Sequence, residues 1–274
     1  MTVSVAHVDR DHVMVTGPEA LAYLHSQVSQ RLDDLAVGES RWSFVLQPQG
    51  KSEGVFRITR LGDEELLLDC DPGVGAQVSD SIARFKLRTK AEFVVSTGTM
   101  IEVRGEGAAD AAAAAAVEAA AVVASPWQGP GEAVDVLLPT DPSALPATLD
   151  AEAAAELRLR HGMPSAGVDV ADAIPNETGL IDLTVSFDKG CYRGQELVER
   201  IHARGGNRRE LRRLTAADGG ELAAGAAISD GEREVGNITS AVAGVALGYV
   251  RGDVEPDASL SVGDVQVVVE PLFG

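Results

Sequence analysis

The sequence predicts an α+β protein whose C-terminal part is a small antiparallel β-barrel or sandwich. Residues 41–139 contain runs of expected strands interrupted by two expected helices, which suggests a sheet with helices on one face, close to a ferredoxin-like arrangement. The residues after 208 instead form short β-like runs separated by Gly, Asp and Pro. A length of 274 residues fits two or three such subdomains.

The elements before residue 140 follow from apolar spacing and composition. A helix is expected over 15–32, because Leu21, Leu24 and Val28 recur at three and four residues after a Gly-Pro start. Elsewhere, runs rich in β-branched and aromatic residues predict strands, and helically spaced or alanine-rich runs predict helices. The expected strands are 41–47, 54–60, 64–70, 91–97, 100–105 and 133–139, and the expected helices are 73–89 and 109–123.

A Pro-rich junction at 141–149 separates these elements from the next region. A helix is expected over 150–162, with Asp150 as its N-cap and Gly162 at its end. Residues 163–190 form a long irregular stretch whose aliphatic content indicates order, and an ordered loop of that length is typical of a functional segment. The β-like runs of the last region are 226–230, 235–241, 245–250 and 265–271.

The chain is strongly acidic, with a net charge of −19. A field of that sign repels phosphate backbones and argues against general nucleic-acid binding. No run approaches the roughly 18 apolar residues of a membrane span, and the first residues lack a secretory signal, so a cytoplasmic protein is expected. Seven arginines nevertheless crowd between Arg193 and Arg213. This cluster indicates one of two things: a helix face whose arginines pair with nearby glutamates, or a local binding site for a carboxylated or phosphorylated small molecule.

Two cysteines, Cys70 and Cys191, cannot supply a four-thiolate iron–sulfur cluster, and no His/Cys cluster has metal-ligand spacing. Cys70 lies in an apolar strand and is expected to be a small buried side chain. Cys191 lies between Lys189 and Arg193, just before an expected helix, and these neighbours favour a thiolate with a lowered pKa. The alternative is a strained turn in which the flanking glycines supply unusual backbone angles.

The segment Phe187–Arg209, FDKGCYRGQELVERIHARGGNRR, resembles the K-G-C-Y/F-x-G-Q-E signature of the YgfZ folate-binding family. That family is related to the glycine-cleavage T-protein (aminomethyltransferase) and to mitochondrial assembly factors for 4Fe–4S proteins. Weaker resemblances follow in the expected order along nearly the whole chain. Their segments are VTGPEALAYLHSQVSQ, LQPQGKSEGVFRI, ELRLRHGMP, IPNETGL and VGNITSA with ALGYV.

The resemblance implies a T-protein-like fold of two interleaved α+β subdomains and a C-terminal antiparallel β-barrel. The folate-binding region would be 1–208, divided into subdomain A (about 1–40 and 140–208) and a ferredoxin-like subdomain B (about 41–139), followed by the barrel at 209–274.

The resemblance also implies a tetrahydrofolate ligand. It places Glu177 as the carboxylate that binds the amino and ring N–H groups of the pterin, with a solvated loop glutamate as the alternative. Arg158 would pair with Glu177 or hold the loop, and His202 is read as an ordinary polar helix residue. The other candidates for binding the ligand, several of them for its glutamate tail, are Lys189, Tyr192, Arg193, Gln195, Arg204 and Arg208.

One departure from the T-protein concerns a pair of aspartates in its hairpin, where this chain has Gly54 and Val55. Glu53 is adjacent, but strand alternation points it to another side. General acid–base help for aminomethyl transfer would therefore be missing. Neither tryptophan, Trp42 or Trp127, lies in the helices 15–32 and 150–162, so aromatic stacking on folate would come from elsewhere.

The implied function is a folate-binding protein that assists the assembly or repair of iron–sulfur enzymes, including those that modify tRNA. Cys191 would act as a reactive thiol near the folate or a partner's cluster, and iron–sulfur client proteins would be the partners. Two alternatives remain open: a folate-dependent one-carbon transferase or demethylase, and a scaffold that has lost its folate.

Overall fold

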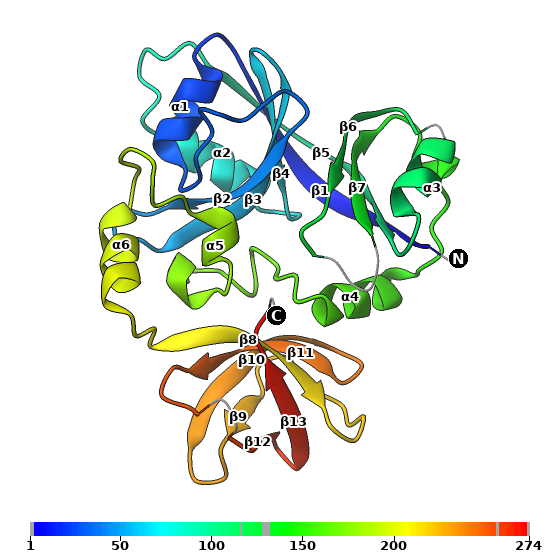
Figure 1. The fold of residues 1–274 in the computed structure, drawn as a ribbon, viewed down its shortest axis with the longest axis vertical. Helices are drawn as coiled ribbons and strands as arrows, with labels where there is room; N and C mark the ends of the chain where they lie inside the picture. Colours follow the sequence, from blue (N-terminus) through cyan, green and yellow to red (C-terminus); the bar gives the residue numbers. More distant parts are fainter. Residues whose placement is uncertain (1–2, 116, 128–131, 256–257, 273–274) are drawn as a thin grey trace.

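A seven-stranded antiparallel sheet forms the larger part of the molecule (Figure 1). The computed structural model describes residues 3–115, 117–127, 132–255 and 258–272. The order of strands in the sheet is β2-β3-β4-β1-β5-β7-β6. The strands are β1 (Ser4–Thr16), β2 (Ser40–Leu46), β3 (Ser52–Gly62), β4 (Glu65–Cys70), β5 (Glu92–Arg104), β6 (Ala119–Ala124) and β7 (Ala133–Pro139).

The long central pair of this sheet, β1 and β5, differs from the expectation. β1 was not predicted, because its middle carries Arg10, Asp11 and His12, whose burial conceals the alternation of a strand. β5 is one continuous strand where two were expected, and it pairs with β1 along its whole length. Gly98 permits this continuity, since a Cβ there would lie 2.8 Å from Nδ1 of His12.

The alanine-rich segment is helical only in its first half, so the prediction of one helix over 109–123 is wrong. Helix α3 covers Ala108–Ala114, residue 116 lies outside the described residues, and β6 pairs with β7. The helix propensity of alanine is weak compared with a complete row of backbone hydrogen bonds to a neighbouring strand, and tertiary context overrides it. Val123 is buried while Val122 is exposed, as strand alternation requires.

Two helices cover one face of the β1–β4 half of the sheet, α1 (Ala20–Gln27) and α2 (Gly75–Ala83). Tyr23 of α1 donates its hydroxyl hydrogen to the carbonyl of Ile82 in α2 at 2.7 Å, and both side chains share a core with the sheet. Both helices are shorter than expected. Phe85, which falls within the expected helix 73–89, lies beyond the end of α2 and is half exposed.

The region between the sheet and the barrel is built mostly from irregular chain, as predicted. Helix α4 (Ala151–Arg160) begins at the expected cap, where Oδ1 of Asp150 accepts the backbone N–H of Ala153 at 2.9 Å. The remaining short elements are η1 (Pro142–Ala144), η2 (Pro175–Glu177), α5 (Ile181–Thr184) and α6 (Gln195–Arg204). Aliphatic residues of the irregular stretch fill a core between β2, β3 and the barrel.

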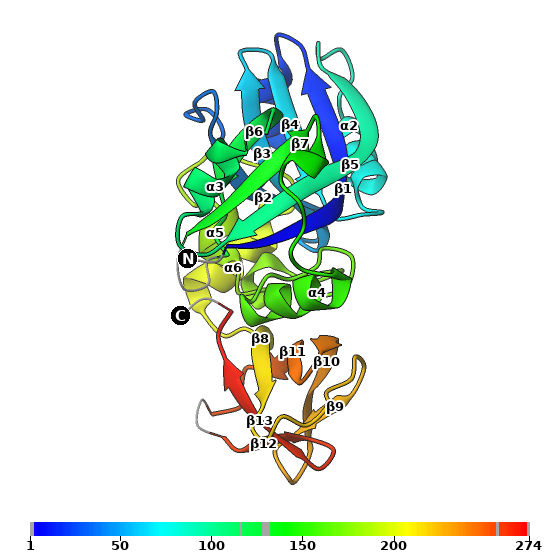
Figure 2. The ribbon, with the colours of Figure 1, turned by 90° about the vertical axis from the view of Figure 1, so that its right-hand side faces the viewer.

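The C-terminal region closes into an antiparallel barrel of the order β10-β11-β8-β13-β12-β9, at the end of the molecule away from the sheet (Figure 2). Its strands are β8 (Arg209–Ala216), β9 (Ala227–Ser229), β10 (Glu234–Val242), β11 (Val245–Arg251), β12 (Leu260–Val262) and β13 (Val265–Glu270). The barrel has an apolar core of its own. The predicted α+β fold with a C-terminal β-barrel is therefore confirmed.

The subdomain boundaries stay a prediction. One continuous sheet joins β1, from the segment assigned to subdomain A, to strands assigned to subdomain B. Within the described part of the chain, no helix is long and apolar enough to cross a bilayer.

Candidate functional site

A pocket of about 400 Å³ lies where the sheet, the end of β6 and helix α5 meet, and we refer to it as the central pocket. Its volume falls within the range of small-molecule sites, roughly 300–1,000 Å³. Trp42 of β2 forms one wall and meets Trp127 edge to face, with ring centroids 4.5 Å apart. The lining residues are Gln30, Ser40, Arg41, Trp42, Arg57, Ala124, Ser125, Pro126 and Leu183.

Arg57 of β3 is held at this pocket by two buried carboxylates. Its Nη2 donates to Oδ2 of Asp69 at 2.7 Å, and its Nη1 donates to Oδ2 of Asp135 at 2.6 Å. Its guanidinium carbon also lies 5.4 Å from the centroid of the Trp42 ring, a cation–π arrangement. Arg57 is 1% exposed, so its position is fixed from several sides before any ligand is present.

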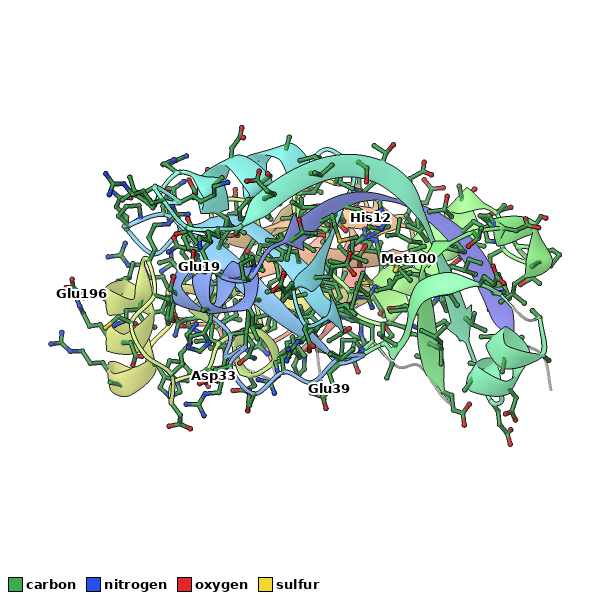
Figure 3. The ribbon with its side chains drawn as sticks, turned by 90° about the horizontal axis from the view of Figure 1, so that it is seen from above. His12, Glu19, Asp33, Glu39, Met100 and Glu196 are labelled. Atoms are coloured by element: carbon green, nitrogen blue, oxygen red, sulfur yellow. The ribbon has the colours of Figure 1, made fainter. Side chains whose placement is uncertain are left out.

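These contacts belong to a network of buried charges across β1, β3, β4, β5 and β7. Asp69 also accepts from Nε of Arg10 at 2.9 Å, and Asp135 pairs with Arg104 at 2.7 Å. Burial alone would raise the pKa of Asp69, but the guanidinium groups of Arg10 and Arg57 outweigh it and lower the pKa. Figure 3 looks down on this sheet, with His12 and Met100 labelled near its centre.

Two polar atoms of the pocket-lining residues are buried without a hydrogen-bond partner among the described residues. They are Nε of Arg57 and Oγ of Ser125, a residue that is 1% exposed. A buried polar group without a partner costs free energy, and native proteins satisfy nearly all of them. A donor and a hydroxyl left free beside an aromatic wall are the features expected of a site for a planar, polar ligand.

The cysteine-containing motif lies apart from this pocket and acts mainly through backbone contacts. The ammonium of Lys189 donates to the carbonyls of His25, Val28 and Gln30 at 2.5, 2.6 and 3.0 Å. These carbonyls lie at and just after the end of α1, so Lys189 ties the motif to that helix. Burial lowers the pKa of Lys189 to about 8.

Arg193 reaches across the chain to the hairpin and to α2. Its Nε donates to the carbonyl of Leu46 at 2.5 Å, and Nη2 pairs with Oε2 of Glu53 at 2.7 Å. Nη1 donates to the carbonyl of Ser81 at 3.1 Å, and the guanidinium carbon lies 5.5 Å from the Phe85 ring centroid. Glu53, the residue beside the missing acid pair, thus binds the motif arginine.

Between these two anchors the chain makes a turn that requires glycine. Gly194 has a φ of +81°, and a Cβ there would lie 2.3 Å from the carbonyl oxygen of Gln47. Oε1 of Gln195 accepts the backbone N–H of Tyr192 at 3.0 Å. Burial raises the pKa of Tyr192, whose hydroxyl has no hydrogen-bond partner among the described residues. The thiol of Cys191 is free and exposed.

Glu177 lies in the 3₁₀ turn η2 and is 8% exposed. Its Oε2 accepts from Nε of Arg209 at 3.2 Å, and the guanidinium of Arg209 stacks over Tyr249 of the barrel, 4.1 Å from the ring centroid. Burial raises the pKa of Tyr249, while the arginine opposes that rise. The carboxylate predicted to bind pterin therefore faces a barrel arginine and is not among the residues that line the central pocket.

Arg158 of α4 holds the irregular stretch. Its Nη1 donates to the carbonyl of Met163 at 2.7 Å and lies 3.4 Å from Oδ2 of Asp169. Oδ1 of the buried Asp169 accepts from the hydroxyls of Thr239 at 2.5 Å and Ser240 at 2.6 Å in the barrel. Of the two roles predicted for Arg158, these contacts fit the second, fixing the loop to the barrel.

The remaining predicted residues are on the surface. Arg204 and Arg208 are exposed, and the ring of His202 stacks on Phe187 with centroids 3.7 Å apart. The predicted candidates thus divide into an anchored turn, an ion pair at the barrel and exposed arginines. None of the residues predicted to bind the ligand is among those that line the central pocket.

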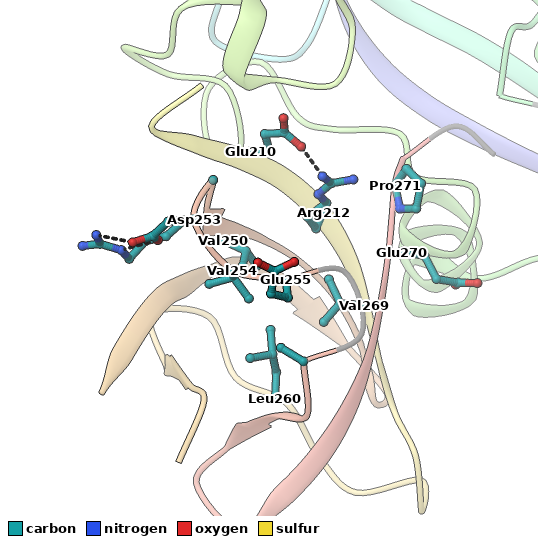
Figure 4. A pocket seen from close by; sticks show the side chains of 13 residues that line it. Glu210, Arg212, Val250, Asp253, Val254, Glu255, Leu260, Val269, Glu270 and Pro271 are labelled. Carbon is teal, nitrogen blue, oxygen red and sulfur yellow. Dashed lines mark hydrogen bonds and ion pairs between the residues drawn. The ribbon is translucent and has the colours of Figure 1, made fainter. Parts of the chain in front are cut away.

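A second pocket, of about 490 Å³, opens on the barrel (Figure 4). Val250, Val254, Leu260 and Val269 form its apolar wall, with Glu255 among them. Two ion pairs lie at its rim, Glu210 with Arg212 and Arg251 with Asp253. Among the described residues, no group of three or more His, Cys, Asp or Glu side chains could hold a metal ion.

Sequence reasoning missed Trp42, Arg57 and Ser125 as candidate site residues. A signal existed, because Arg57 lies two residues after Val55 in a strand, on the face that packs inward. An arginine at an inward position predicts a buried carboxylate partner. Register then places Trp42 directly opposite Arg57 on β2, which the sequence alone does not reveal.

The comparisons with known proteins agree with this architecture. Residues 208–272 match the family model described as the C-terminal beta-barrel domain of CAF17. A protein of Vibrio vulnificus named tRNA-modifying protein YgfZ is 27% identical over 223 residues, covering 75% of this chain and 67% of that protein. One of the same name from Escherichia coli O157:H7 is 35% identical over 131 residues, covering 42% of this chain and 40% of the other.

A crystal structure of the glycine cleavage system aminomethyltransferase T from Bartonella henselae resembles the whole fold. Its TM-score is 0.81 at 18% sequence identity, covering 98% of this chain and 86% of that one. The expected T-protein-like fold is confirmed by this match. The resemblance to the YgfZ proteins, drawn from the cysteine motif, is supported by sequence relatives and by the barrel model together.

Proposed function

We propose, from these similarities, that the chain is a YgfZ-like protein that binds a reduced folate in the central pocket and assists iron–sulfur enzymes, including those that modify tRNA. The observation that carries the proposal is the pairing of an aromatic wall, Trp42, with two buried polar atoms that lack partners, on Arg57 and Ser125.

The lining of the pocket suits the pterin part of a folate. A pterin is a flat heteroaromatic ring that can lie against an indole and carries both hydrogen-bond donors and acceptors. Nε of Arg57 would donate to an acceptor on the ring, and Oγ of Ser125 would accept or donate at its edge. Arg41 also lines the pocket and would attract the anionic glutamate tail. Glu177 is paired with Arg209 and does not line this pocket, so the proposal gives it no contact with the pterin.

The hairpin beside the pocket favours binding over one-carbon transfer. Val55 lies on the same face of β3 as Arg57, two residues away, and the resemblance places a T-protein aspartate at or next to this position. A valine cannot accept or donate a proton, so a bound tetrahydrofolate would lack this source of general acid–base catalysis. We therefore place the chain among folate binders and not among aminomethyltransferases.

The cysteines favour an assisting role over that of a cluster-carrying protein. Cys70 is fully buried, and burial raises the pKa of its thiol well above the ordinary value, so it is a poor ligand. Cys191 is the accessible thiol, and a cluster that it contacts would need further ligands from a client. The net charge of −19 favours action on tRNA through such client enzymes in the cytoplasm, because direct binding to RNA would be electrostatically opposed.

Isothermal titration calorimetry tests the folate site, with tetrahydrofolate and 6-methyltetrahydropterin as probes. Trp42→Phe should weaken both probes at least threefold, because the smaller ring loses contact area. Arg41→Ala should weaken only tetrahydrofolate, since the pterin probe has no glutamate tail. Arg251→Ala, which removes an equal charge from the barrel surface, is the matched control and should leave both affinities unchanged. Wild-type protein that binds neither probe would refute the folate proposal.

The assisting role is tested in bacteria that lack their own YgfZ protein. Expression of this chain should restore tRNA nucleosides made by iron–sulfur enzymes, as measured by mass spectrometry of hydrolysed tRNA. Cys191→Ser should restore less than wild type, whereas Cys70→Ser, at the buried thiol, should restore fully once its expression is matched. Equal restoration by Cys191→Ser would remove the thiol from the proposal.

A further inference from the structure

Strand β5 has a free edge over its first half. Its residues Glu92–Thr99 pair with β1 on one side, but β7 pairs only with Met100–Arg104 on the other. Within the described residues, no strand pairs with the outer edge of Glu92–Thr99. Figure 2 shows this part of β5 at the margin of the sheet. An edge of this kind offers unpaired backbone N–H and C=O groups to another strand.

Apolar side chains are exposed along this edge and beside it. Val94 and Val95 point to opposite faces of the sheet and are 61% and 43% exposed. Phe85 and Leu87, in the segment that leads into β5, are 50% and 92% exposed. These four make up half of the large apolar residues that are exposed in the described part of the chain. Such a concentration marks an interaction surface.

The edge also lacks the features by which proteins protect free strands. Residues Phe93–Thr97 contain no lysine, no other charge and no proline. Natural edge strands are normally short, charged, kinked by proline or a bulge, or covered. A long, uncharged and apolar edge therefore indicates that another strand covers it in the working protein.

We propose that the occupant is a second copy of this chain, with Phe93–Thr97 of the two copies paired antiparallel about a two-fold axis at Val95. In an antiparallel pair, residues that face each other lie on the same side of the sheet. When a strand pairs with its own copy about a two-fold axis, odd-numbered residues therefore face odd-numbered residues, and even-numbered residues face even-numbered ones. Val95 then faces the partner's Val95, and Val94 faces the partner's Ser96. Phe93 faces the partner's Thr97.

This register is complementary to itself. Val95 faces its own copy and Phe93 faces Thr97, and such aromatic and β-branched pairs stabilise neighbouring strands. No like charges are opposed. Glu92, the first charged residue, would face the partner's Gly98. Each copy carries a net charge of −19 and repels the other at long range. This edge is preceded by four cationic residues, Arg84, Lys86, Arg88 and Lys90. Arg84 pairs with Glu53 and Lys86 with Glu92 within the chain, so only part of this positive charge reduces the repulsion near the contact.

The proposal is tested by sedimentation velocity and light scattering at about 1–100 µM protein. This range detects dimers whose dissociation constants lie near those concentrations. Wild type should reach twice the 28.5 kDa mass of one chain. Val95→Lys should raise the dissociation constant at least tenfold, because two ammonium groups then face each other. Val122→Lys, at an exposed valine of the other edge region, is the matched control and should dimerise like wild type.

A cross-link provides a measurement that does not depend on the lysine variant. Val95→Cys in a Cys191→Ser background should form an intermolecular disulfide under mild oxidation, since Cys70 is buried. A monomer at every concentration would overturn the proposal. So would a dimer that survives Val95→Lys, a dimer that Val122→Lys disrupts equally, or a dimer that fails to cross-link through residue 95.

Discussion

Replacing Asp69 with asparagine removes the charge that balances two buried arginines. Asp69 is fully buried and accepts from Nε of Arg10 at 2.9 Å and Nη2 of Arg57 at 2.7 Å. Breaking a buried ion pair from one side costs about 3–5 kcal/mol. Arg57 keeps Asp135 and Arg10 keeps Asp71, so we expect a loss of about 3 kcal/mol, at the lower end of that range. At about 2–4 °C per kcal/mol, the melting temperature should fall by about 6–12 °C.

Urea unfolding followed by circular dichroism measures this loss, and its pH dependence tests the cause. The pKa of Asp69 is lower in the folded protein than in the unfolded chain, where it is about 3.9. Its contribution is therefore complete above that value and is lost as pH falls through the folded-state pKa. The cost of Asp69→Asn should be full at pH 7 and shrink below about pH 4. Asp63→Asn, at a side chain that is 94% exposed, is the control. A cost below about 1 kcal/mol, the range of surface pairs, or one that does not change with pH, would refute the reasoning.

Three further outcomes are expected around the cysteine motif. Gly194→Ala should lower stability by at least about 2 kcal/mol in urea, because its φ is +81° and its Cβ would collide with the carbonyl oxygen of Gln47; an unchanged midpoint would contradict the close contact. Tyr192→Phe should be neutral or stabilising by up to about 1 kcal/mol, since the hydroxyl is buried without a described partner; a larger loss would reveal one. The pKa of Lys189 is lowered to about 8, so above pH 8 the unfolded chain binds more protons at this residue, and the contribution of Lys189 to stability should gain between pH 8 and 10. Lys189→Met should lack that gain when the two urea series are compared.

Much of the fold could be predicted because apolar periodicity records which face of an element is buried. The hairpin of β2 and β3, the capped helix α4 and the barrel strands all carry that record. β1 does not, because the consecutive residues Arg10, Asp11 and His12 put buried polar side chains on both of its faces, and Arg10 is paired with Asp69, far away in the sequence. β6 was missed for a related reason: alanine favours a helix in isolation, and only pairing with β7 makes it a strand.

The candidate site was less predictable than the fold, since a pocket is formed by segments that are distant in sequence. Gln30, Arg57, Ser125 and Leu183 come from four separate parts of the chain, and no local pattern connects them. The cysteine motif was visible as a motif, but its flanking charges were expected to act on the thiol. In the structure, Lys189 binds three carbonyls at and just after the end of α1, and Arg193 binds Glu53, so both charges have partners elsewhere.

The same contacts explain why the motif is so dense in specific residue types. Lys189 fixes one side of the turn, Arg193 fixes the other, and Gly194 lets the chain pass against the hairpin. Gln195 then closes the turn on the backbone of Tyr192. Cys191 is the exception within this segment, because its side chain is exposed and forms no hydrogen bond with the described residues. Folding uses the neighbours of the thiol but not the thiol itself. The exposed thiol on this anchored turn is therefore accessible to the client contact proposed above.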